Sequence, residues 1–374
     1  MKPTRPDVIA VVQPFVPTYR KPLFDAIDAE LRTRGLRLEV WHDFPKGRVA
    51  ARGNADRGSW SVPIRQRRLS IGRRNVTFRS VHSDARRVRA VIAGLASTNL
   101  ETYALAVDPR VNLMLWGHGK NFTASNSGLD SRIERWLADR SSHVFTYTEE
   151  GKDHVVGRGL PDHMVTVVVN TTDTASLRRE KHATTPEMSR ALRDRFDLGT
   201  SRVALFVGAF DAPKQLPFLI SAMDIVVRDH PDVVLVMAGA GPDDAVVHAL
   251  AESRPYVRVI GRLEASELAQ FSTITDLLVM PGRVGLVAVD ALALGLPIAT
   301  TSYPFHAPEA RYLSAGTDSL WTKFEIEDYA RGVSGLFSGR EELSRLSSGA
   351  AAKGAGFSVE ASARRFADGI LRGL

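Results

Sequence analysis

The feature that most constrains this sequence is residues 277–301, LLVMPGRVGLVAVDALALGLPIATT. The first four residues are apolar and indicate a buried strand, and a turn containing Gly282 and Gly285 follows. The apolar residues after this turn have helical spacing as far as Gly295, and a second strand begins at Ile298. A strand, a glycine turn, a helix and a strand form a βαβ unit. The helix N-terminus of such a unit favours an anion, most simply a phosphate.

The length and composition of the chain limit its class. A chain of 374 residues is too long for one ordinary core, so we expect two domains. The absence of cysteine excludes disulfides, thiolate metal sites and cysteine nucleophiles. The N-terminal apolar run does not resemble a signal sequence, and no uncharged run has the length of a membrane span. These features predict a soluble cytoplasmic protein.

The net charge of +7 is concentrated in one basic span. Its arginines are Arg65, Arg67, Arg68, Arg73, Arg74, Arg79, Arg86, Arg87 and Arg89. Such a cluster can contact acidic lipid headgroups or a diphosphate-bearing substrate, or it can be a solvated surface. We do not expect nucleic acid as a partner, because the span lacks zinc-ligand spacing and the aromatic residues of an RNA-binding sheet.

Strand and helix patterns alternate along both halves of the chain. In the first half the patterns run from a buried strand at 7–13 to a strand at 165–169, with a helix expected at 83–95 and a strand at 104–108. A second, more regular alternation begins at Val203. Alternating strands and helices predict an α/β fold with two doubly wound, Rossmann-like domains.

The boundaries of these domains follow from a change in composition. Residues 171–202 carry no strand signal, so we place the first boundary near Thr174. The expected organisation is a C-terminal domain at 175–355, whose helix N-termini would bind phosphates, and an N-terminal domain at 1–174, whose loops would face the other substrate. Residues 356–374 contain a last amphipathic helix that we expect to pack back on the N-terminal domain.

The second half of the chain resembles the retaining GT-B glycosyltransferases of family 4. The matching segments are LFVGAFDAPKQLPFLISAM (205–223), VMAGAGP (236–242), VRVIGRL (257–263), MPGRVGLVAVDALALGLPIATT (280–301) and HAPEARYL (306–313). The first half matches more loosely, through VPTYRKPLFDAI (16–27), WGHGKNF (116–122), FTYTEEGKDHVVGRGL (145–160) and VTVVVNTTDT (165–174). This resemblance implies a GT-B fold, in which two Rossmann-like domains face a central cleft.

The resemblance also implies residues that bind a nucleotide-diphosphate sugar. The phosphate lysine of the family falls on Lys214, for which we expect a catalytic electrostatic role, whereas the arginine five residues earlier is replaced by Ala209. The second glutamate of the family's acidic motif falls on Asp290, and the first falls on Gly282. Three explanations of this loss stay open: Arg283 or a backbone group takes over part of the role, the donor sugar lacks the usual hydroxyl pattern, or the protein is not a catalyst. Arg283 is the catalytic candidate. The other expected donor contacts are Gly208, Gly239, Ile260, Arg262, Gly285, Leu286 and Val287.

The first half supplies candidates for the other substrate. His118 stands between two glycines directly after a strand, where family members place a catalytic histidine near the donor sugar. The flanking glycines suggest a close backbone approach, and a surface loop histidine is the alternative. Lys120 and Asn121 are candidates for the same rim, and Tyr19 and Arg20 are candidate acceptor contacts.

No metal site is expected. His306 and Glu309 have the spacing of a metal pair, but further ligands and the Asp-x-Asp signature of metal-dependent sugar transferases are missing. The resemblance implies no separate cofactor, because the nucleotide sugar is itself the co-substrate.

Together these features predict a glycosyltransferase that moves a sugar from a nucleotide-diphosphate donor to a hydroxyl of a saccharide or lipid-linked saccharide acceptor. The resemblance implies retention of configuration and a role in surface polysaccharide or glycoconjugate biosynthesis. The basic span suggests contact with the inner face of the membrane. Two alternatives remain open at this point: a nucleotide-sugar epimerase or hydrolase of the same fold, and a non-catalytic donor-binding protein.

Overall fold

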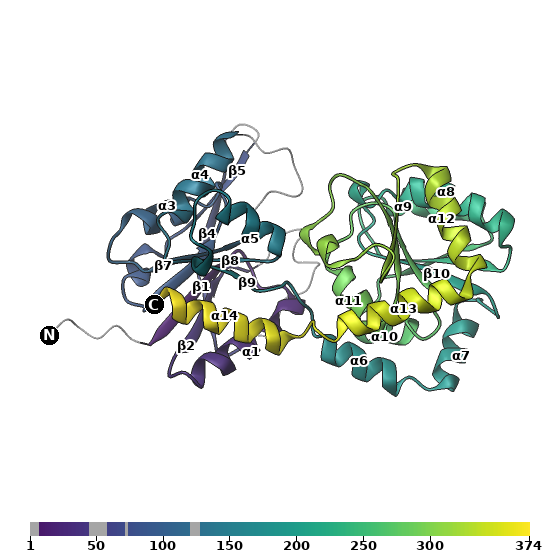
Figure 1. Ribbon diagram of the computed structural model, residues 1–374, viewed down its shortest axis with the longest axis horizontal. Coiled ribbons are helices and arrows are strands. Elements are labelled where there is room, and N and C mark those ends of the chain that lie inside the picture. The colour runs from purple at the N-terminus through teal and green to yellow at the C-terminus, as the bar shows by residue number, and fades with distance from the viewer. Residues whose placement is uncertain (1–6, 45–57, 72–73, 120–127) are drawn as a thin grey trace. The chain divides into compact units, whose positions relative to one another are not determined.

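The computed structural model describes residues 7–44, 58–71, 74–119 and 128–374. The chain folds into two compact units (Figure 1). Unit 1 comprises Met1–Thr172 together with Val359–Leu374, and unit 2 comprises Asp173–Ser358. The last helix of the chain therefore belongs to unit 1.

Unit 1 contains a parallel seven-stranded sheet with the order β3-β2-β1-β6-β7-β8-β9. Its strands are β1 Val8–Gln13, β2 Arg37–His42, β3 Ser61–Pro63, β6 Ala90–Gly94, β7 Leu113–Gly117, β8 His143–Thr146 and β9 Val165–Val167. A separate antiparallel hairpin is formed by β4 Gln66–Ile71 and β5 Arg74–Arg79. The helices are η1 Thr18–Arg20, α1 Lys21–Arg32, α2 His82–Ala85, α3 Leu100–Val107, α4 Gly128–Ala138, α5 Glu149–Val156, η3 Asp162–Met164 and α14 Val359–Gly373.

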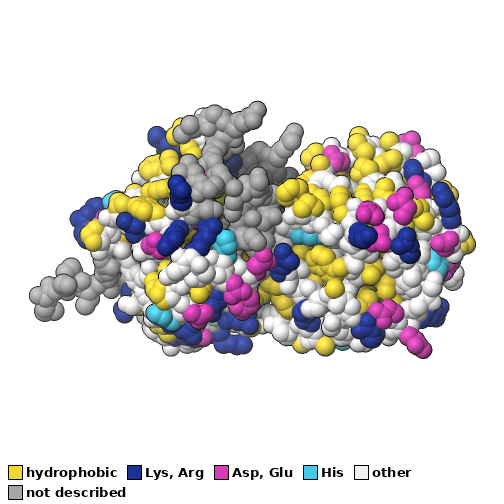
Figure 2. Space-filling model, turned by 45° about the horizontal axis from the view of Figure 1, so that its top comes forward, with side chains coloured by type: hydrophobic (Ala, Val, Ile, Leu, Met, Phe, Trp, Pro, Cys, Tyr) yellow, Lys and Arg dark blue, Asp and Glu magenta, His cyan; other side chains and the backbone are white. Residues whose placement is uncertain are grey.

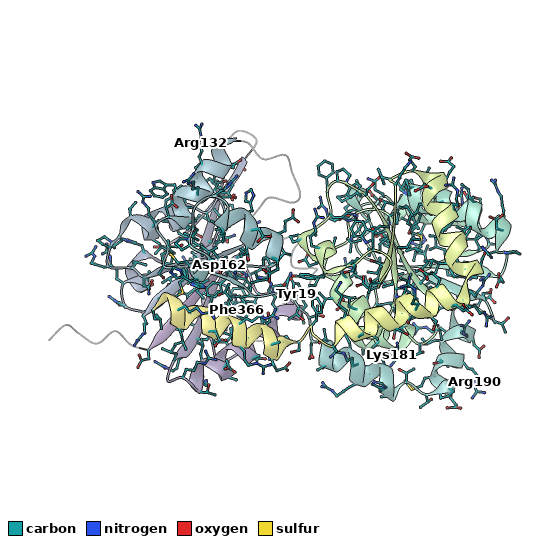
Figure 3. All side chains as sticks on the ribbon, in the orientation of Figure 1. Tyr19, Arg132, Asp162, Lys181, Arg190 and Phe366 are labelled. Carbon is teal, nitrogen blue, oxygen red and sulfur yellow. The ribbon has the colours of Figure 1, made fainter. Side chains whose placement is uncertain are left out.

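Hydrophobic side chains cover both faces of the unit 1 sheet. One core cluster joins the sheet to α1 and α14, and the other joins it to α3, α4 and α5. Phe366 of α14, labelled in Figure 3, packs its ring 4.8 Å from that of Trp116 in β7. Strands buried on both faces read as continuous apolar runs, which is why the order of apolar segments predicted a parallel sheet.

Two sequence predictions in unit 1 are wrong. The helix expected at 83–95 is replaced by the short α2 and by β6, which lies beside β1 in the middle of the sheet. A short, wholly apolar run cannot be assigned to strand or helix by periodicity alone. The strand expected at 104–108 lies mostly within α3, whose Leu and Ala residues favour a helix and which buries Glu101 and Leu105 one turn apart.

Unit 2 contains a parallel six-stranded sheet with the order β12-β11-β10-β13-β14-β15. Its strands are β10 Arg202–Val207, β11 Val233–Ala238, β12 Val257–Gly261, β13 Leu277–Met280, β14 Ile298–Thr301 and β15 Ser319–Thr322. The helices are α6 Thr174–Ala183, α7 Pro186–Arg195, η4 Ala212–Lys214, α8 Leu216–Asp229, α9 Asp244–Glu252, α10 Ala265–Phe271, α11 Val287–Leu294, η5 Pro308–Tyr312, α12 Ile326–Ser338 and α13 Arg340–Gly354.

The βαβ unit expected at 277–301 is present as β13, α11 and β14. Gly295 ends α11 in the left-handed conformation, with φ +64°, where glycine is favoured. The strand order reverses between β10 and its neighbour β13, because β11 and β12 extend the sheet to one side and β14 and β15 to the other. In open parallel sheets the carboxyl ends of strands at such a reversal form a binding crevice.

Candidate functional site

The loops that follow β10 and β13 are joined by hydrogen bonds at this reversal of strand order. The Nζ of Lys214 donates to the backbone oxygen of Arg283 at 2.7 Å, and the N–H of Arg283 donates to the oxygen of Pro213 at 2.9 Å. Gly208 adjoins the same lysine, since a Cβ at this glycine would lie 3.2 Å from Lys214 Cε. The structure therefore brings together Gly208, Lys214 and the backbone of Arg283, three of the residues predicted for donor binding or catalysis.

Lys214 lies in an environment that disfavours its charge. Burial lowers the pKa of Lys214 to about 8; the neighbouring carboxylates of Asp211 and Glu309 oppose this shift, and the cation of Arg283 adds to it. Part of Asp211 is itself buried, and its Oδ1 has no hydrogen-bond partner among the described residues. A lysine with a depressed pKa gains from an incoming anion, which restores the stability of its charged form.

This pKa predicts a pH-dependent affinity for a nucleoside diphosphate. The amine is mostly charged below pH 8 and loses its proton above it, so the association constant should be nearly level below pH 8 and fall by up to about tenfold per pH unit above it. Isothermal calorimetry between pH 6.5 and 9.5 measures this profile. Lys214→Met should bind weakly with a level profile above pH 7, and a wild-type profile that stays level through pH 9.5 would contradict the prediction.

Gly282 has no room for a side chain. A Cβ at this position would lie 2.5 Å from Pro213 O and 2.5 Å from the carbonyl carbon of Lys214. The backbone of the Lys214 loop thus occupies the space into which a glutamate would extend. The close approach of the loop after β10 to the turn after β13 therefore requires glycine at position 282, where the family has a glutamate.

The N-terminus of α11 presents unpaired N–H groups beside this contact. Within the described residues, the N–H groups of Gly285, Leu286 and Val287 have no hydrogen-bond acceptor, whereas the next two N–H groups bond back to the oxygens of Gly285 and Leu286 at 2.9 Å each. Three unpaired N–H groups at a helix N-terminus provide the geometry that binds a phosphate. Asp290 lies one turn further along α11 and is half-buried.

His306 holds the turn that leads into α11, a role that sequence reasoning missed. Its Nδ1 accepts from the N–H of Val284 at 3.0 Å, and its Nε2 lies 2.9 Å from the oxygen of Thr301, so Nε2 is the protonated nitrogen. Burial lowers the pKa of His306, which favours this neutral form. No grouping of three potential metal-ligating side chains occurs in the part of the chain that the structure describes.

The other predicted donor residues lie at two places. Gly239, after β11, packs on the β10 loop, since a Cβ there would lie 2.0 Å from Gly208 O; this close contact accounts for the glycine. Ile260 and Arg262 lie at the end of β12, separated from β10 by β11. The side chain of Arg283 turns toward the loop after β14, where its Nε donates to Phe305 O at 2.8 Å.

The predicted residues of unit 1 also lie at the carboxyl ends of strands. Arg20, after β1, donates from Nη2 to the phenolic oxygen of Tyr147 at 2.8 Å, and the exposed His118, after β7, stacks its ring 4.9 Å from that of Tyr147. Tyr19, labelled in Figure 3, is 42% exposed. Tyr147 was not singled out from the sequence, although its place directly after a buried strand was a usable signal. Lys120 and Asn121 lie outside the described residues.

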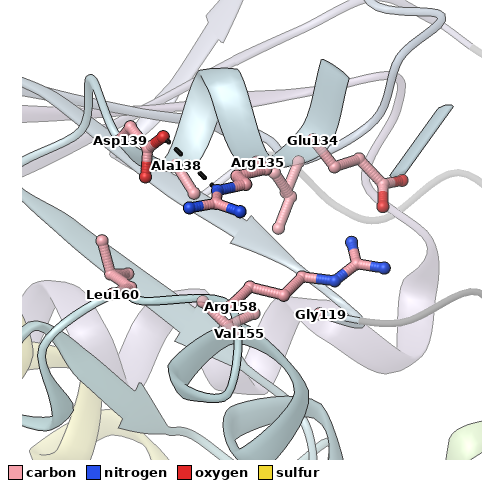
Figure 4. Close-up of a pocket in the computed structure, with 9 residues that line it drawn as sticks. Gly119, Glu134, Arg135, Ala138, Asp139, Val155, Arg158 and Leu160 are labelled. Carbon is pink, nitrogen blue, oxygen red and sulfur yellow. Dashed lines mark ion pairs between the residues drawn. The ribbon is translucent and has the colours of Figure 1, made fainter. Parts of the chain in front are cut away.

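The glycines around His118 do make close contacts. Gly119 has φ +70°, and a Cβ there would lie 2.4 Å from Gly151 O, near the start of α5. A small pocket beside Gly119 is lined by Leu95, Glu134, Arg135, Ala138, Asp139, Val155, Arg158 and Leu160 (Figure 4). Arg135 and Asp139 of this pocket form an exposed ion pair at 3.9 Å. The backbone at His118 and Gly119 therefore packs closely on that of Gly151.

The basic span is not a single solvated surface. Arg79 is 3% exposed and forms a buried ion pair with Glu101. Arg86 bonds Asp108 at 2.6 Å and Arg89 bonds Asp7 at 2.9 Å. On the face shown in Figure 2, basic and acidic side chains are interspersed. Among the arginines of this span whose side chains the structure describes, the exposed ones are Arg65, Arg67, Arg68 and Arg87, with Arg86 and Arg89 exposed beside their partners. Arg73 and the side chain of Arg74 lie outside that description.

A protein-family match lies within the second unit. Residues 189–353 match the family described as glycosyl transferases group 1. This segment of the chain is therefore similar to a glycosyltransferase domain. The same segment contains the Lys214 loop, the Gly282 contact and the α11 N-terminus described above.

Two curated relatives match part of the chain. Glycogen synthase of Mycobacterium tuberculosis is 28% identical over 182 residues, which cover 46% of this chain and 40% of the relative. The alpha-monoglucosyldiacylglycerol synthase of Acholeplasma laidlawii is 27% identical over 125 residues, which cover 32% of this chain and 31% of the relative. The matches thus span less than half the length of these relatives.

Structural similarity extends over both units. The crystal structure of HepE from Anabaena in complex with UDP has a TM-score of 0.70, with 17% identity and coverage of 97% of this chain and 99% of that one. At this identity the likeness establishes the fold alone. The two Rossmann-like units form the GT-B fold, as the sequence predicted.

Proposed function

We propose that this protein transfers a sugar from a nucleotide-diphosphate donor to a hydroxyl group of a saccharide or lipid-linked saccharide. The observation that carries this proposal is the joined pair of loops in unit 2, where Lys214 and the unpaired N–H groups of α11 flank the reversal of strand order. A cation and a helix N-terminus at this edge are suited to a diphosphate. The glycosyltransferase domain match over the same residues supports it.

In this proposal the chemistry is carried by electrostatic stabilisation of the leaving diphosphate. Lys214 and the N–H groups of Gly285, Leu286 and Val287 would neutralise the charge that develops as the sugar–phosphate bond breaks. Arg283 would lie near the donor sugar, and Asp290 would accept from the ribose hydroxyls. The resemblance to family 4 supports a catalytic role for His118. The resemblance to family 4 supports retention of configuration and a reaction without a separate cofactor.

The proposed acceptor is a saccharide or a lipid-linked saccharide of a surface polysaccharide or glycoconjugate. One relative is named for synthesis of a glucosylated diacylglycerol, which supports an acceptor at a lipid surface. No described helix has the length and apolar character to cross a bilayer. The exposed hairpin residues Arg67, Arg68, Leu69 and Phe78 suit contact with the inner face of a membrane, so we propose a peripheral cytoplasmic location.

Calorimetry with UDP, GDP, ADP, dTDP and CMP on the wild type and on Lys214→Met tests the donor site. UDP is the first probe, because it is the nucleotide in the similar HepE structure. We expect one diphosphate to bind selectively and the substitution to weaken it. If none of the five nucleotides binds, Lys214 and the N-terminus of α11 do not form a diphosphate site. Transfer from the matching nucleotide sugar to saccharide and lipid-linked acceptors then tests the reaction.

Gly285→Ala tests whether this glycine is required for diphosphate binding or for the stability of the fold. A Cβ at Gly285 would meet only the Cβ of Ala307, at 3.8 Å, which is ordinary van der Waals contact. We therefore expect an unchanged urea midpoint but an affinity for the selected diphosphate at least about tenfold lower, because the methyl group would obstruct the phosphate. Unchanged affinity in the alanine variant would show that the phosphate does not approach this turn.

A non-catalytic donor-binding protein is the second candidate. The observation that favours it is the substitution of the family's first acidic residue by Gly282, where backbone fills the space, together with Ala209 in place of a cation. This candidate predicts nucleotide binding that depends on Lys214 but no turnover with any acceptor. Sugar transfer or release of free sugar from the donor would eliminate it.

A further inference from the structure

Arg20 is enclosed by neutral groups in unit 1. Its Nη1 donates to Gln13 Oε1 at 3.3 Å and its Nη2 to the phenolic oxygen of Tyr147 at 2.8 Å. Its guanidinium carbon lies 4.9 Å from the ring centroid of Trp116 and 5.9 Å from those of Tyr19 and Tyr147. Aromatic faces attract a cation, but they carry no countercharge.

Among the described residues, no carboxylate compensates the positive charge of Arg20. Its buried Nε also has no hydrogen-bond partner there. By contrast, the buried cation of Arg79 in the same unit is neutralised by an ion pair with Glu101. An unpaired cation and an unsatisfied N–H both cost free energy, and such defects persist where a ligand completes the site.

Arg20 also lies where a parallel sheet binds ligands. It follows β1, and the strand order of unit 1 reverses between β1 and β6. Trp116 and Tyr147 stand at the carboxyl ends of β7 and β8, so the guanidinium and its neighbours share the ligand-binding edge. The side chain is only half-buried, so part of it remains open to solvent.

We propose that Arg20 is the centre of an anion site, filled by a carboxylate or phosphate group of the acceptor. The inference rests on the proposed function, in which unit 1 takes the acceptor, and it adds that this acceptor is anionic. A guanidinium is the side chain best matched to these two groups, because it offers paired N–H donors in a planar arrangement. Tyr147 positions the guanidinium, and the exposed His118 borders the site.

The test compares charged and neutral probes by calorimetry. Methyl β-glucuronide and methyl β-glucoside share a ring and differ in the carboxylate, while methyl phosphate tests a phosphate group. The wild type should bind one of the two anionic probes at least about tenfold more tightly than the glucoside. Arg20→Gln should abolish this preference. The control variant Arg37→Gln removes a positive charge from an exposed residue at the amino end of β2. This control should retain the preference for the anionic probe.

Lys214→Met separates this inference from the proposed donor site. Lys214→Met should lose nucleoside diphosphate affinity and keep the preference for the anionic probe. Arg20→Gln should keep nucleoside diphosphate affinity and lose that preference. If Arg20→Gln no longer unfolds cooperatively, Arg20→Lys replaces it and should bind the anion several-fold more weakly than the wild type. Equal affinity of the wild type for charged and neutral probes would overturn the inference. So would a preference that survives Arg20→Gln, or a loss of diphosphate binding in that variant.

Discussion

Replacing Lys214 with methionine is expected to lower kcat/KM for sugar transfer by about 100- to 1,000-fold. The amine lies between the β10 loop and the turn before α11, where it bonds Arg283 O at 2.7 Å. Removing a preorganised charge that acts on a developing anion typically has an effect of this size. Steady-state kinetics with the nucleotide sugar identified by calorimetry measure it.

The same substitution should not weaken the fold. The pKa of Lys214 is lowered to about 8 by burial, so the folded state holds this proton less tightly than the unfolded chain, and the charged amine reduces stability near neutral pH. Methionine fills a similar volume without a charge, so we expect a urea midpoint equal to or above that of the wild type. Arg331→Ala, which removes an exposed cation from α12, should change neither activity nor stability. A parallel fall of activity and stability in Lys214→Met would mean that the lysine is structural.

The regular alternation of strands and helices made the fold predictable from the sequence. The stretch from β13 to β14 was the clearest part, because its apolar runs are separated by glycines with defined conformational roles. The prediction failed at β6 and α3, where apolar runs of a few residues fit either a strand or a helix. Local pattern alone does not decide such runs, since the neighbouring strands of the sheet supply the deciding contacts.

The candidate site was only partly predictable, because its key contacts join distant segments. The Lys214 amine meets an oxygen 69 residues away, and Arg20 meets a phenol 127 residues away. Lys214 was found through a resemblance in sequence. The enclosure of Arg20, the support that His306 gives to the α11 turn and the backbone contact at Gly282 depend on which strands are neighbours. Strand order, and hence these contacts, becomes visible only in three dimensions.

The contact at Gly282 predicts the largest loss of stability. In Gly282→Ala the new methyl group would lie 2.5 Å from Pro213 O and from the carbonyl carbon of Lys214, and both neighbours are backbone atoms that cannot rotate away. We expect a loss of about 1–3 kcal/mol in the free energy of unfolding, because one of the two loops must shift. Diphosphate affinity should fall as well, since the shift moves Lys214 away from the N-terminus of α11.

Gly335→Ala is the matched control for this prediction. Gly335 lies on the exposed side of α12, and a Cβ there would have no heavy atom within 4 Å, so alanine should stabilise the helix by about 0.5–1 kcal/mol. Gly282→Glu tests the same contact more severely, because it restores the residue that the family usually has. Its side chain would have to displace the Lys214 loop, so we expect lower stability and no gain in transfer. Urea unfolding and calorimetry on the three variants measure these effects, and a Gly282→Ala protein as stable as the wild type would show that the two loops can separate without cost.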